Sequence, residues 1–319
     1  MRIYNHVCML RILFMGTPDF AVPSLRALAA DHQVVAVVTQ PDAPAGRGRE
    51  LVQSAVKQAA LELGLPVLQP LSLKQPEAAA ELSALRPDII FVAAFGQILR
   101  RAILDLPPLG CLNAHASLLP RWRGASPANA AIAAGDAETG VTLMKMDPGL
   151  DTGPIIAQRH EPIRSDDTTA TLLARLAGLG AALARETLPA WARGEIPAVA
   201  QDPGRVTTCG LMKKEDGRID WSRQAAAVER HVRAMTPWPG ASTTWVGKQM
   251  RIVRARVAPS PVDTPAGTVV AIGGGFGVVC GEGTLEIIEA QLEGRKPMSG
   301  ADLARGQRGL IGAILGETL

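Results

Sequence analysis

The sequence predicts an α/β fold, in which a Rossmann-like, mostly parallel sheet domain is followed by a small OB-like β-barrel domain. In the first half, short apolar runs alternate with segments of helical periodicity, a pattern typical of doubly wound sheets. In the second half, short β-rich pieces are separated by glycine and proline turns, which is typical of small barrels. The chain of 319 residues is long enough for two domains, because single cores rarely grow beyond about 250 to 300 residues. We expect a catalytic domain at 1–193, a linker at 194–220 and a barrel at 221–319.

The first half is expected to alternate strand and helix. Strands are expected at Arg11–Met15, Val34–Thr39, Asp88–Ala93, Cys111–His115 and Thr142–Met146. Helices are expected at Phe20–Ala30, Ser54–Leu63, Gln75–Leu85, Pro127–Ala134 and Thr168–Arg193. Ligands of parallel sheets bind at the carboxyl ends of the strands, so the functional residues should lie in the loops that follow these five strands.

The second half begins with Gly194–Asp220, whose weak periodicity and many glycines and prolines predict a linker. A helix at Ser222–Met235 should follow it. Strands are then expected at Ala241–Trp245, Gln249–Val257, Gly267–Ile272, Gly277–Cys280 and Leu285–Glu289. Each is short and bounded by turn residues, which favours an antiparallel β domain.

The composition narrows the class of protein. The net charge of +3 neither requires nor excludes a nucleic-acid partner. The four cysteines are scattered without a CxxC pair, which argues against a metal site and against a disulfide framework, and fits a reducing cytoplasm. No apolar stretch approaches the roughly 18 residues of a membrane helix. We therefore expect a cytoplasmic protein without a membrane or metal partner. We also expect a monomer.

The segment after the fourth expected strand carries the clearest chemical signal, CLNAHASLLPRWRGASP. Asn113 and His115 stand two residues apart on an extended stretch, so both project from one face. Acyl transfer to an amine needs a hydrogen-bond donor that stabilises the oxyanion and a group that moves protons near neutral pH. A side-chain amide and an imidazole supply these two groups. An Asn-x-His pair is also compatible with a capping asparagine and a packed histidine.

Asp151 lies in the string MDPGLDTG, which follows the fifth expected strand. We expect it at the same end of the sheet as His115, where a carboxylate would orient the imidazole and stabilise its protonated form. An Asx turn ahead of Thr152 and Gly153 is the alternative role. The loop Gly16–Phe20 lacks the glycines of a GxGxxG motif, which argues against a dinucleotide-binding enzyme.

Together, N-x-H-x-S-L-L-P-x-x-R-G and L-D-T-G resemble the folate-dependent formyltransferase superfamily. The resemblance implies that Asn113, His115 and Asp151 are catalytic and that 10-formyltetrahydrofolate is the formyl donor, without a metal or covalent intermediate. It implies a folate site formed by two segments, whose residues are Phe95, Gly96, Gln97, Ile98 and Leu99, and Ser117, Leu118, Leu119 and Pro120.

The string RILFMGTPDFAVPSL and the basic loop PAGRG resemble the branch of the superfamily whose acceptor is methionyl initiator tRNA. This resemblance implies a tRNA site that includes Arg47, Arg49 and Lys57. In the β domain, Arg254 and Arg256 alternate with apolar residues along one expected strand face and would contact the RNA backbone. The linker departs from the family's usual pattern near Thr208 and Leu211, which leaves Lys213 and Lys214 as its strongest candidates.

Two other functions compete with formylation of tRNA. One is a formyltransferase that acts on the amine of a nucleotide-linked sugar, which would need no basic loop at Arg47 and Arg49. The other is a folate- or RNA-binding module without activity, which would not need all of Asn113, His115 and Asp151.

Overall fold

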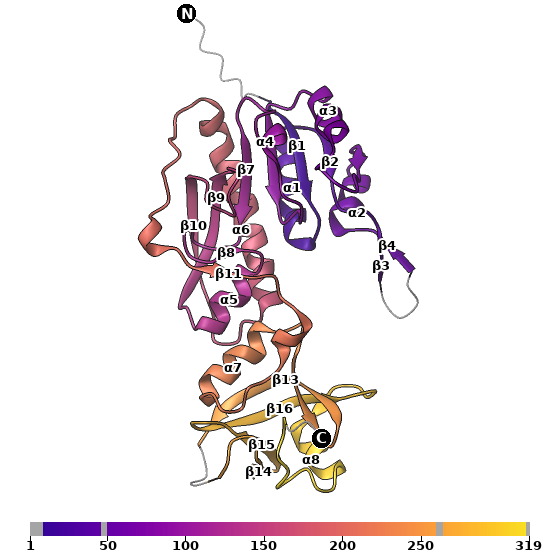
Figure 1. Ribbon diagram of the computed structural model, residues 1–319, viewed down its shortest axis with the longest axis vertical. Helices are drawn as coiled ribbons and strands as arrows, with labels where there is room; N and C mark the ends of the chain where they lie inside the picture. The colour runs from indigo at the N-terminus through magenta and orange to yellow at the C-terminus, as the bar shows by residue number, and fades with distance from the viewer. Residues whose placement is uncertain (1–8, 46–49, 260–263, 317–319) are drawn as a thin grey trace, which may run out of the picture. The chain divides into compact units, whose positions relative to one another are not determined.

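The computed structural model describes residues 9–45, 50–259 and 264–316 (Figure 1). Seven strands form the central sheet, in the order β10-β9-β7-β6-β1-β2-β5. Their bounds are β1 Arg11–Gly16, β2 Gln33–Val38, β5 Val67–Leu68, β6 Ile89–Ala93, β7 Cys111–His115, β9 Glu138–Lys145 and β10 Ile155–Pro162. The strands from β7 to β5 pair in parallel, whereas β9 is antiparallel to both of its neighbours. The prediction of a mostly parallel sheet is confirmed.

The direction of β9 corrects the expectation for the loop after Met146. Leu112 pairs with Lys145 and His115 pairs with Thr142, so β9 ends beside the beginning of β7. The expectation that this loop starts at the carboxyl edge of the parallel strands was wrong, because apolar periodicity gives no strand direction. Strand β10, which was not expected, follows as the second arm of a hairpin.

Helices of the expected kind connect the strands. They are α1 Val22–Asp31, α2 Ala55–Glu62, α3 Pro76–Ala84, α4 Arg101–Leu104, α5 Pro127–Ala134 and α6 Thr169–Ala192, with a short 3-10 turn, η1 Asp19–Ala21, ahead of α1. Helix α2 begins after Ser54, whose hydroxyl accepts the main-chain N–H of Lys57 at 3.1 Å, and α5 ends at Gly135, whose φ is 79°. Only α4 was absent from the expected set.

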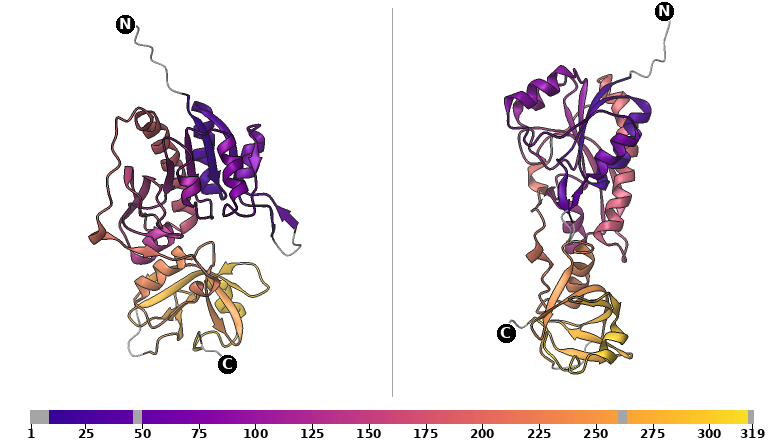
Figure 2. Two further views of the ribbon diagram at one scale, coloured as in Figure 1. Left: turned by 45° about the horizontal axis from the view of Figure 1, so that its top comes forward. Right: turned by 90° about the vertical axis from the view of Figure 1, so that its right-hand side faces the viewer.

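Helices cover both faces of the central sheet (Figure 2). Right-handed crossovers place α1 on one face and α3 on the other, because the chain reverses its direction across the sheet between β5 and β6. Helix α6 lies on the face of α1, where Gly180 packs against Ala114 and Val141. Cys111, on the opposite face, belongs to the core cluster beneath α3 and α4. Asn113 and His115 alternate with Ala114, so they project from the face opposite α6.

The second half forms a separate antiparallel sheet in the order β12-β13-β16-β15-β14, with β17 beside β16. Its strands are β12 Ala241–Trp245, β13 Lys248–Ala258, β14 Val269–Ile272, β15 Gly275–Val279, β16 Thr284–Leu292 and β17 Met298–Ser299. Helices α7 Ala225–Ala234 and α8 Gly300–Gly306 accompany it. The predicted change from a parallel α/β sheet to a β-rich second half is confirmed.

The chain divides into two compact units that interleave along the sequence. The first unit extends through Gly124 and includes Glu138–Pro162 and Leu173–Cys209, and the second holds Ala125–Ala137, Ile163–Leu172 and the chain from Gly210 onward. The remaining short elements are β3 Ala43–Ala45, β4 Glu50–Val52, β8 Arg123–Gly124, β11 Thr208–Cys209, η2 Pro203–Arg205 and η3 Lys214–Gly217. The division at 193 and 221 expected from the sequence stays a prediction.

Candidate functional site

Strand β7 presents two polar side chains on one face. Asn113 is half-buried, and His115, the last residue of the strand, is only 6% exposed. Their neighbours Leu112 and Ala114 are buried on the other face. On the polar face, Cys111 completes the row, and burial raises the pKa of its thiol to about 12. The cysteine therefore remains a protonated core residue, and the chemistry of this face belongs to the amide and the imidazole.

Asp151 joins these two side chains through both of its carboxylate oxygens. The Oδ1 atom lies 3.5 Å from Nδ2 of Asn113, and Oδ2 lies 3.6 Å from Nδ1 of His115. The main-chain N–H of Gly124 donates to Oδ2 at 2.8 Å. Asp151 has a φ of 52°, a left-handed conformation that aspartate tolerates better than most residues. The loop after β9 thus folds back over β7, and the three residues expected to be catalytic lie together in the first unit.

The second nitrogen of His115 contacts the main chain. Its Nε2 atom lies 2.9 Å from the carbonyl oxygen of Trp122, which can only accept a hydrogen bond. Both partners of the ring, this carbonyl and the Asp151 carboxylate, are acceptors. An imidazolium donates to both, so the surroundings are suited to a histidine that takes up a proton during a reaction.

The loop from Ser117 to Trp122 is held by hydrogen bonds within the loop and to Thr142 of β9. The hydroxyl of Ser117 donates to the carbonyl of Arg121 at 2.6 Å, and its carbonyl accepts from the hydroxyl of Thr142 at 2.7 Å. The same Thr142 hydroxyl accepts from the N–H of Leu119 at 3.0 Å. Of the residues expected to bind folate here, Ser117 and Leu119 are buried, and Leu118 and Pro120 are half-buried.

The other segment expected to bind folate follows β6. Phe95 and Leu99 are buried in the core, whereas Ile98 is 77% exposed. The carbonyl of Phe95 accepts from the hydroxyl of Thr17 at 2.9 Å. Gly96 has a φ of 89°, and Gln97 accepts the N–H of Leu73 at 2.9 Å. An anchored main chain that offers an exposed apolar side chain fits contact with a flat heterocycle such as the pterin of a folate.

The residues expected to bind tRNA have different surroundings. Arg47 and Arg49 lie outside the described residues. The ammonium of Lys57 lies 2.6 Å from a carboxylate oxygen of Asp42, and this hydrogen bond, with a second from Gln69, lowers the pKa of Asp42. Arg254 and Arg256 are both exposed on β13.

Arg256 forms an ion pair with Glu286 at 2.7 Å. This leaves Arg254 as the stronger candidate cation of the two expected on this strand, because among the described residues Arg254 forms no ion pair. Lys213 and Lys214, the candidates of the expected linker, are exposed.

Gln201, Thr207 and Cys209 support the site but were not expected from the sequence. Thr207 accepts the N–H of Trp122 at 2.9 Å, and Cys209 belongs to β11, which pairs with β8. Gln201 contacts both Arg123 and the loop of Asp151. The only sequence signal for these residues was a departure from the usual pattern near Thr208, and that signal indicates no contact.

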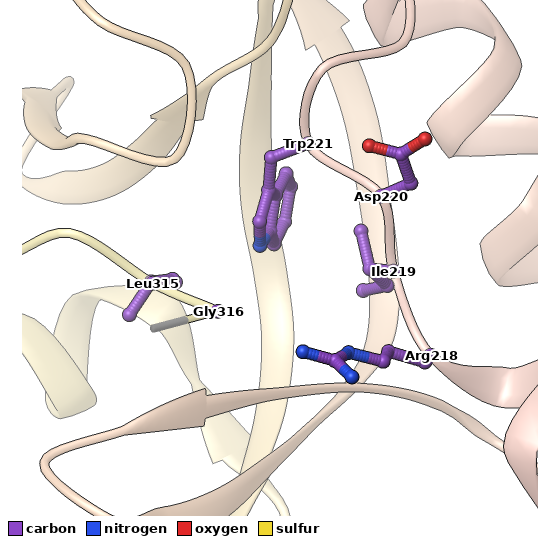
Figure 3. Close-up of a pocket in the computed structure, with 6 residues that line it drawn as sticks. All are labelled: Arg218, Ile219, Asp220, Trp221, Leu315 and Gly316. Atoms are coloured by element: carbon purple, nitrogen blue, oxygen red, sulfur yellow. The ribbon is translucent and has the colours of Figure 1, made fainter. Parts of the chain in front are cut away.

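A cavity lies elsewhere, within the second unit (Figure 3). Its volume is about 450 Å³, and it is lined by Arg218, Ile219, Asp220, Trp221, Leu315 and Gly316. None of the residues expected to be functional lines it. Within the described ranges, no cluster of histidine, cysteine and carboxylate residues could hold a metal ion. The helices of those ranges also include none that could span a membrane.

Comparison with known proteins gives a consistent result. A profile described as formyl transferase matches residues 10–188, and one described as formyl transferase, C-terminal domain, matches residues 211–308. A methionyl-tRNA formyltransferase of Roseiflexus sp. (strain RS-1) is 51% identical over 311 residues, which are 97% of this chain and 96% of the relative. One of Methylococcus capsulatus is 50% identical over 294 residues, 92% of this chain and 96% of that protein.

Among solved structures, an N-formyltransferase from Helicobacter canadensis, in complex with folinic acid and dTDP-3-aminofucose, superposes with a TM-score of 0.66 at 20% identity. The match covers 89% of this chain and 100% of that one. At this identity the likeness concerns the fold.

Proposed function

The chain belongs to the formyl transferase family, and on that premise we propose that it transfers the formyl group of 10-formyltetrahydrofolate to the amino group of methionyl initiator tRNA. Relatives that carry the name methionyl-tRNA formyltransferase are about half identical to it over nearly its whole length. The product, formylmethionyl-tRNA, serves translation initiation.

The observation that carries this proposal is the meeting of Asn113, His115 and Asp151. Asn113 Nδ2 is separated by 3.5 Å from its carboxylate neighbour, a long contact that an approaching oxyanion can replace. In the proposed reaction, the amine nitrogen of the acceptor attacks the formyl carbon. Asn113 donates a hydrogen bond to the oxygen that becomes negative. His115, once it has taken the proton of the amine, donates a second one, for which its Nε2 would have to leave the Trp122 carbonyl. The bond from the formyl carbon to the folate nitrogen then breaks.

Proton movement falls to the imidazole and the carboxylate. The attacking amine must lose a proton, and the departing folate nitrogen must gain one. His115 takes the proton from the amine and gives it to the folate nitrogen, while the adjacent Asp151 carboxylate stabilises the imidazolium. The N–H of Gly124 holds the Oδ2 atom of Asp151, so the carboxylate keeps its place as the ring changes charge.

The residues proposed for the sites of the formyl donor and the formyl acceptor are those that the family resemblance implies. We propose that Phe95–Leu99 and Ser117–Pro120 bind the folate, with exposed Ile98 and the main chain facing the heterocycle. Arg47, Arg49, Lys57, Arg254 and Arg256 are proposed to bind tRNA, and Lys57 would have to exchange Asp42 for a phosphate. We also propose that the enzyme is cytoplasmic and monomeric. Sedimentation with and without tRNA tests the oligomeric state.

One assay tests the proposal directly. The protein is incubated with 10-formyltetrahydrofolate and either charged initiator tRNA or a dTDP-linked amino sugar, and formylated products are measured. We expect formylmethionyl-tRNA and no formylated sugar. Formylation of the sugar alone would replace the proposed acceptor, and no formylation of either would remove the enzymatic function.

A further inference from the structure

Gln201 connects the two segments that hold the proposed catalytic pair, and every hydrogen-bonding position of its side chain is used. Its Oε1 atom accepts from Nε of Arg123 at 3.0 Å and from a terminal guanidinium nitrogen of Arg123 at 2.8 Å. Its Nε2 atom donates to the carbonyls of Asp151 at 2.8 Å and Gly153 at 2.7 Å. An amide has two such donors and two acceptor lone pairs, so the side chain is saturated.

These four contacts require an amide. The guanidinium of Arg123 can only donate, and the two main-chain carbonyls can only accept. A carboxylate at position 201 would satisfy the arginine but place its second oxygen against two carbonyl oxygens. A cationic side chain would make the opposite error. Glutamine is the residue of this length that meets both requirements.

The partners of Gln201 are the segments that orient His115 and Asp151. Arg123 lies in β8, between Trp122, whose carbonyl contacts the His115 ring, and Gly124, whose N–H binds the Asp151 carboxylate. On the other side, Gln201 holds the carbonyl of Asp151 itself. Asp151 has a positive φ, and such a conformation persists only where the surroundings impose it.

We propose that Gln201 is a positioning residue, which sets the distance between the Asp151 carboxylate and the His115 imidazole by clamping the Asp151 turn to β8 through Arg123. Its four hydrogen bonds go to the Arg123 side chain and to the carbonyls of Asp151 and Gly153, none of which is a reacting atom of the proposed mechanism. Its effect on turnover rests on the proposed function, whereas its effect on the His115 ring does not.

The test compares Gln201→Glu and Gln201→Ala with a matched pair, Gln33→Glu and Gln33→Ala. Gln33 also accepts a hydrogen bond from an arginine, with 3.1 Å between its Oε1 and a terminal nitrogen of Arg11. It is exposed at the beginning of β2, at the amino-terminal ends of the parallel strands, whereas His115 lies at the carboxyl end of β7. Thermal unfolding of all four variants reports their folding. Gln201→Glu keeps the shape of the side chain and so guards against a collapse of the loop.

Both Gln201 variants should lower kcat by about tenfold to a hundredfold, because small displacements of catalytic groups have effects of that size. KM for folate and for tRNA should stay within about twofold, because Gln201 acts in the catalytic step rather than in binding. The Gln33 variants should match the parent protein. In an Asp151→Asn background, Gln201→Ala should lower kcat by less than about twofold more, since residues that act as a unit are not additive.

A Gln201→Glu variant with the parent's kcat would overturn the proposal. So would an equal loss from Gln201→Ala with and without Asp151→Asn, because Gln201 would then act independently of Asp151.

A measurement without substrates separates this inference from the proposed function. The ring nitrogen NMR signals of His115 should shift in the Gln201 variants and not in the Gln33 variants. If the parent protein does not formylate charged tRNA, the proposed acceptor is wrong, and these NMR signals still decide the role of Gln201. Unchanged signals would overturn it.

Discussion

The Nδ1 atom of His115 lies 3.6 Å from the Oδ2 atom of Asp151. The distance is long for a hydrogen bond and short enough for the carboxylate to stabilise a charged imidazole. Apo structures often hold catalytic contacts at such lengths, and they tighten when substrates bind.

Replacing any one of Asn113, His115 and Asp151 by alanine should lower kcat by roughly a hundredfold or more, which is the usual contribution of an oxyanion donor or an acid–base group. His115→Ala should also lower the thermal unfolding midpoint, because His115 is buried and contacts the Trp122 carbonyl, so kcat is compared at a temperature below every midpoint. His160→Ala is the matched control, since His160 also faces a carboxylate, that of Glu138 at 3.2 Å, but is exposed on β10. Full activity of His115→Ala would rule out the proposed mechanism.

Binding of the two substrates should respond differently to salt. If the basic loop and the exposed arginines of β13 contact phosphates, KM for tRNA should rise steeply between about 50 and 200 mM salt, because bound counterions are released. KM for folate should rise far less. Measuring both constants over the same salt series checks this, and an equally weak dependence for both substrates would contradict separate sites.

Arg47→Ala should raise KM for tRNA or lower kcat, together by roughly 1 to 3 kcal/mol in transition-state stabilisation, because a guanidinium makes paired contacts with phosphates and base edges. Arg47→Lys should restore only part of the loss, since an ammonium lacks the planar geometry. Folate affinity should be unchanged. Arg193→Ala is a suitable control, because Arg193 is exposed and paired with Glu195. Unchanged tRNA kinetics in Arg47→Ala would favour the amino-sugar acceptor.

The contact between Asp42 and Lys57 should make one part of the fold sensitive to acid. The hydrogen bond from Lys57 lowers the pKa of Asp42 below its ordinary value of 3.8. A carboxyl group with a depressed folded pKa stabilises the fold above its ordinary pKa, and this contribution is lost as the pH falls through the lowered value.

The comparison is between the parent protein and Asp42→Asn, by urea unfolding over a pH series. The parent should be the more stable at neutral pH, and the difference should shrink as the pH falls below 3.8. A difference that stays constant down to about pH 2 would show that ionisation of Asp42 contributes nothing.

The first half of the fold was predictable because its signals are local. The segment Cys111–His115, expected as a strand, has the same bounds as β7, and the helix bounds differed by one or two residues at most ends. The direction of β9 was not predictable, since it depends on the path of the chain between Ala134 and Glu138 rather than on side-chain alternation.

The same distinction applies to the site. Asp151 was expected near His115 because β9 was expected to run parallel to β7. In the structure β9 is antiparallel, and the loop that follows it folds back and places Asp151 beside His115. Gln201 was not foreseen, because three of its four hydrogen bonds involve residues at least 50 positions away. Contacts with main-chain carbonyls require no particular residue type in the partner segment, so its sequence does not indicate them. The ion pair of Lys57 with Asp42 was not predictable for a different reason, since in the sequence each of the two residues looks like an ordinary surface charge.

The chain passes between its two compact units after residues 124, 137, 162, 172 and 209. A gene fragment that starts at residue 210 would therefore lack two pieces of the second unit, including α5, whose Asn129 donates to the carbonyl of Ala234 at 2.7 Å. The second unit is not encoded by one contiguous stretch of the gene. A single crossover between related genes would therefore join segments of this unit that had not evolved together. Recombination should rarely exchange the second unit intact, and the unit should instead change by point substitution within the whole chain.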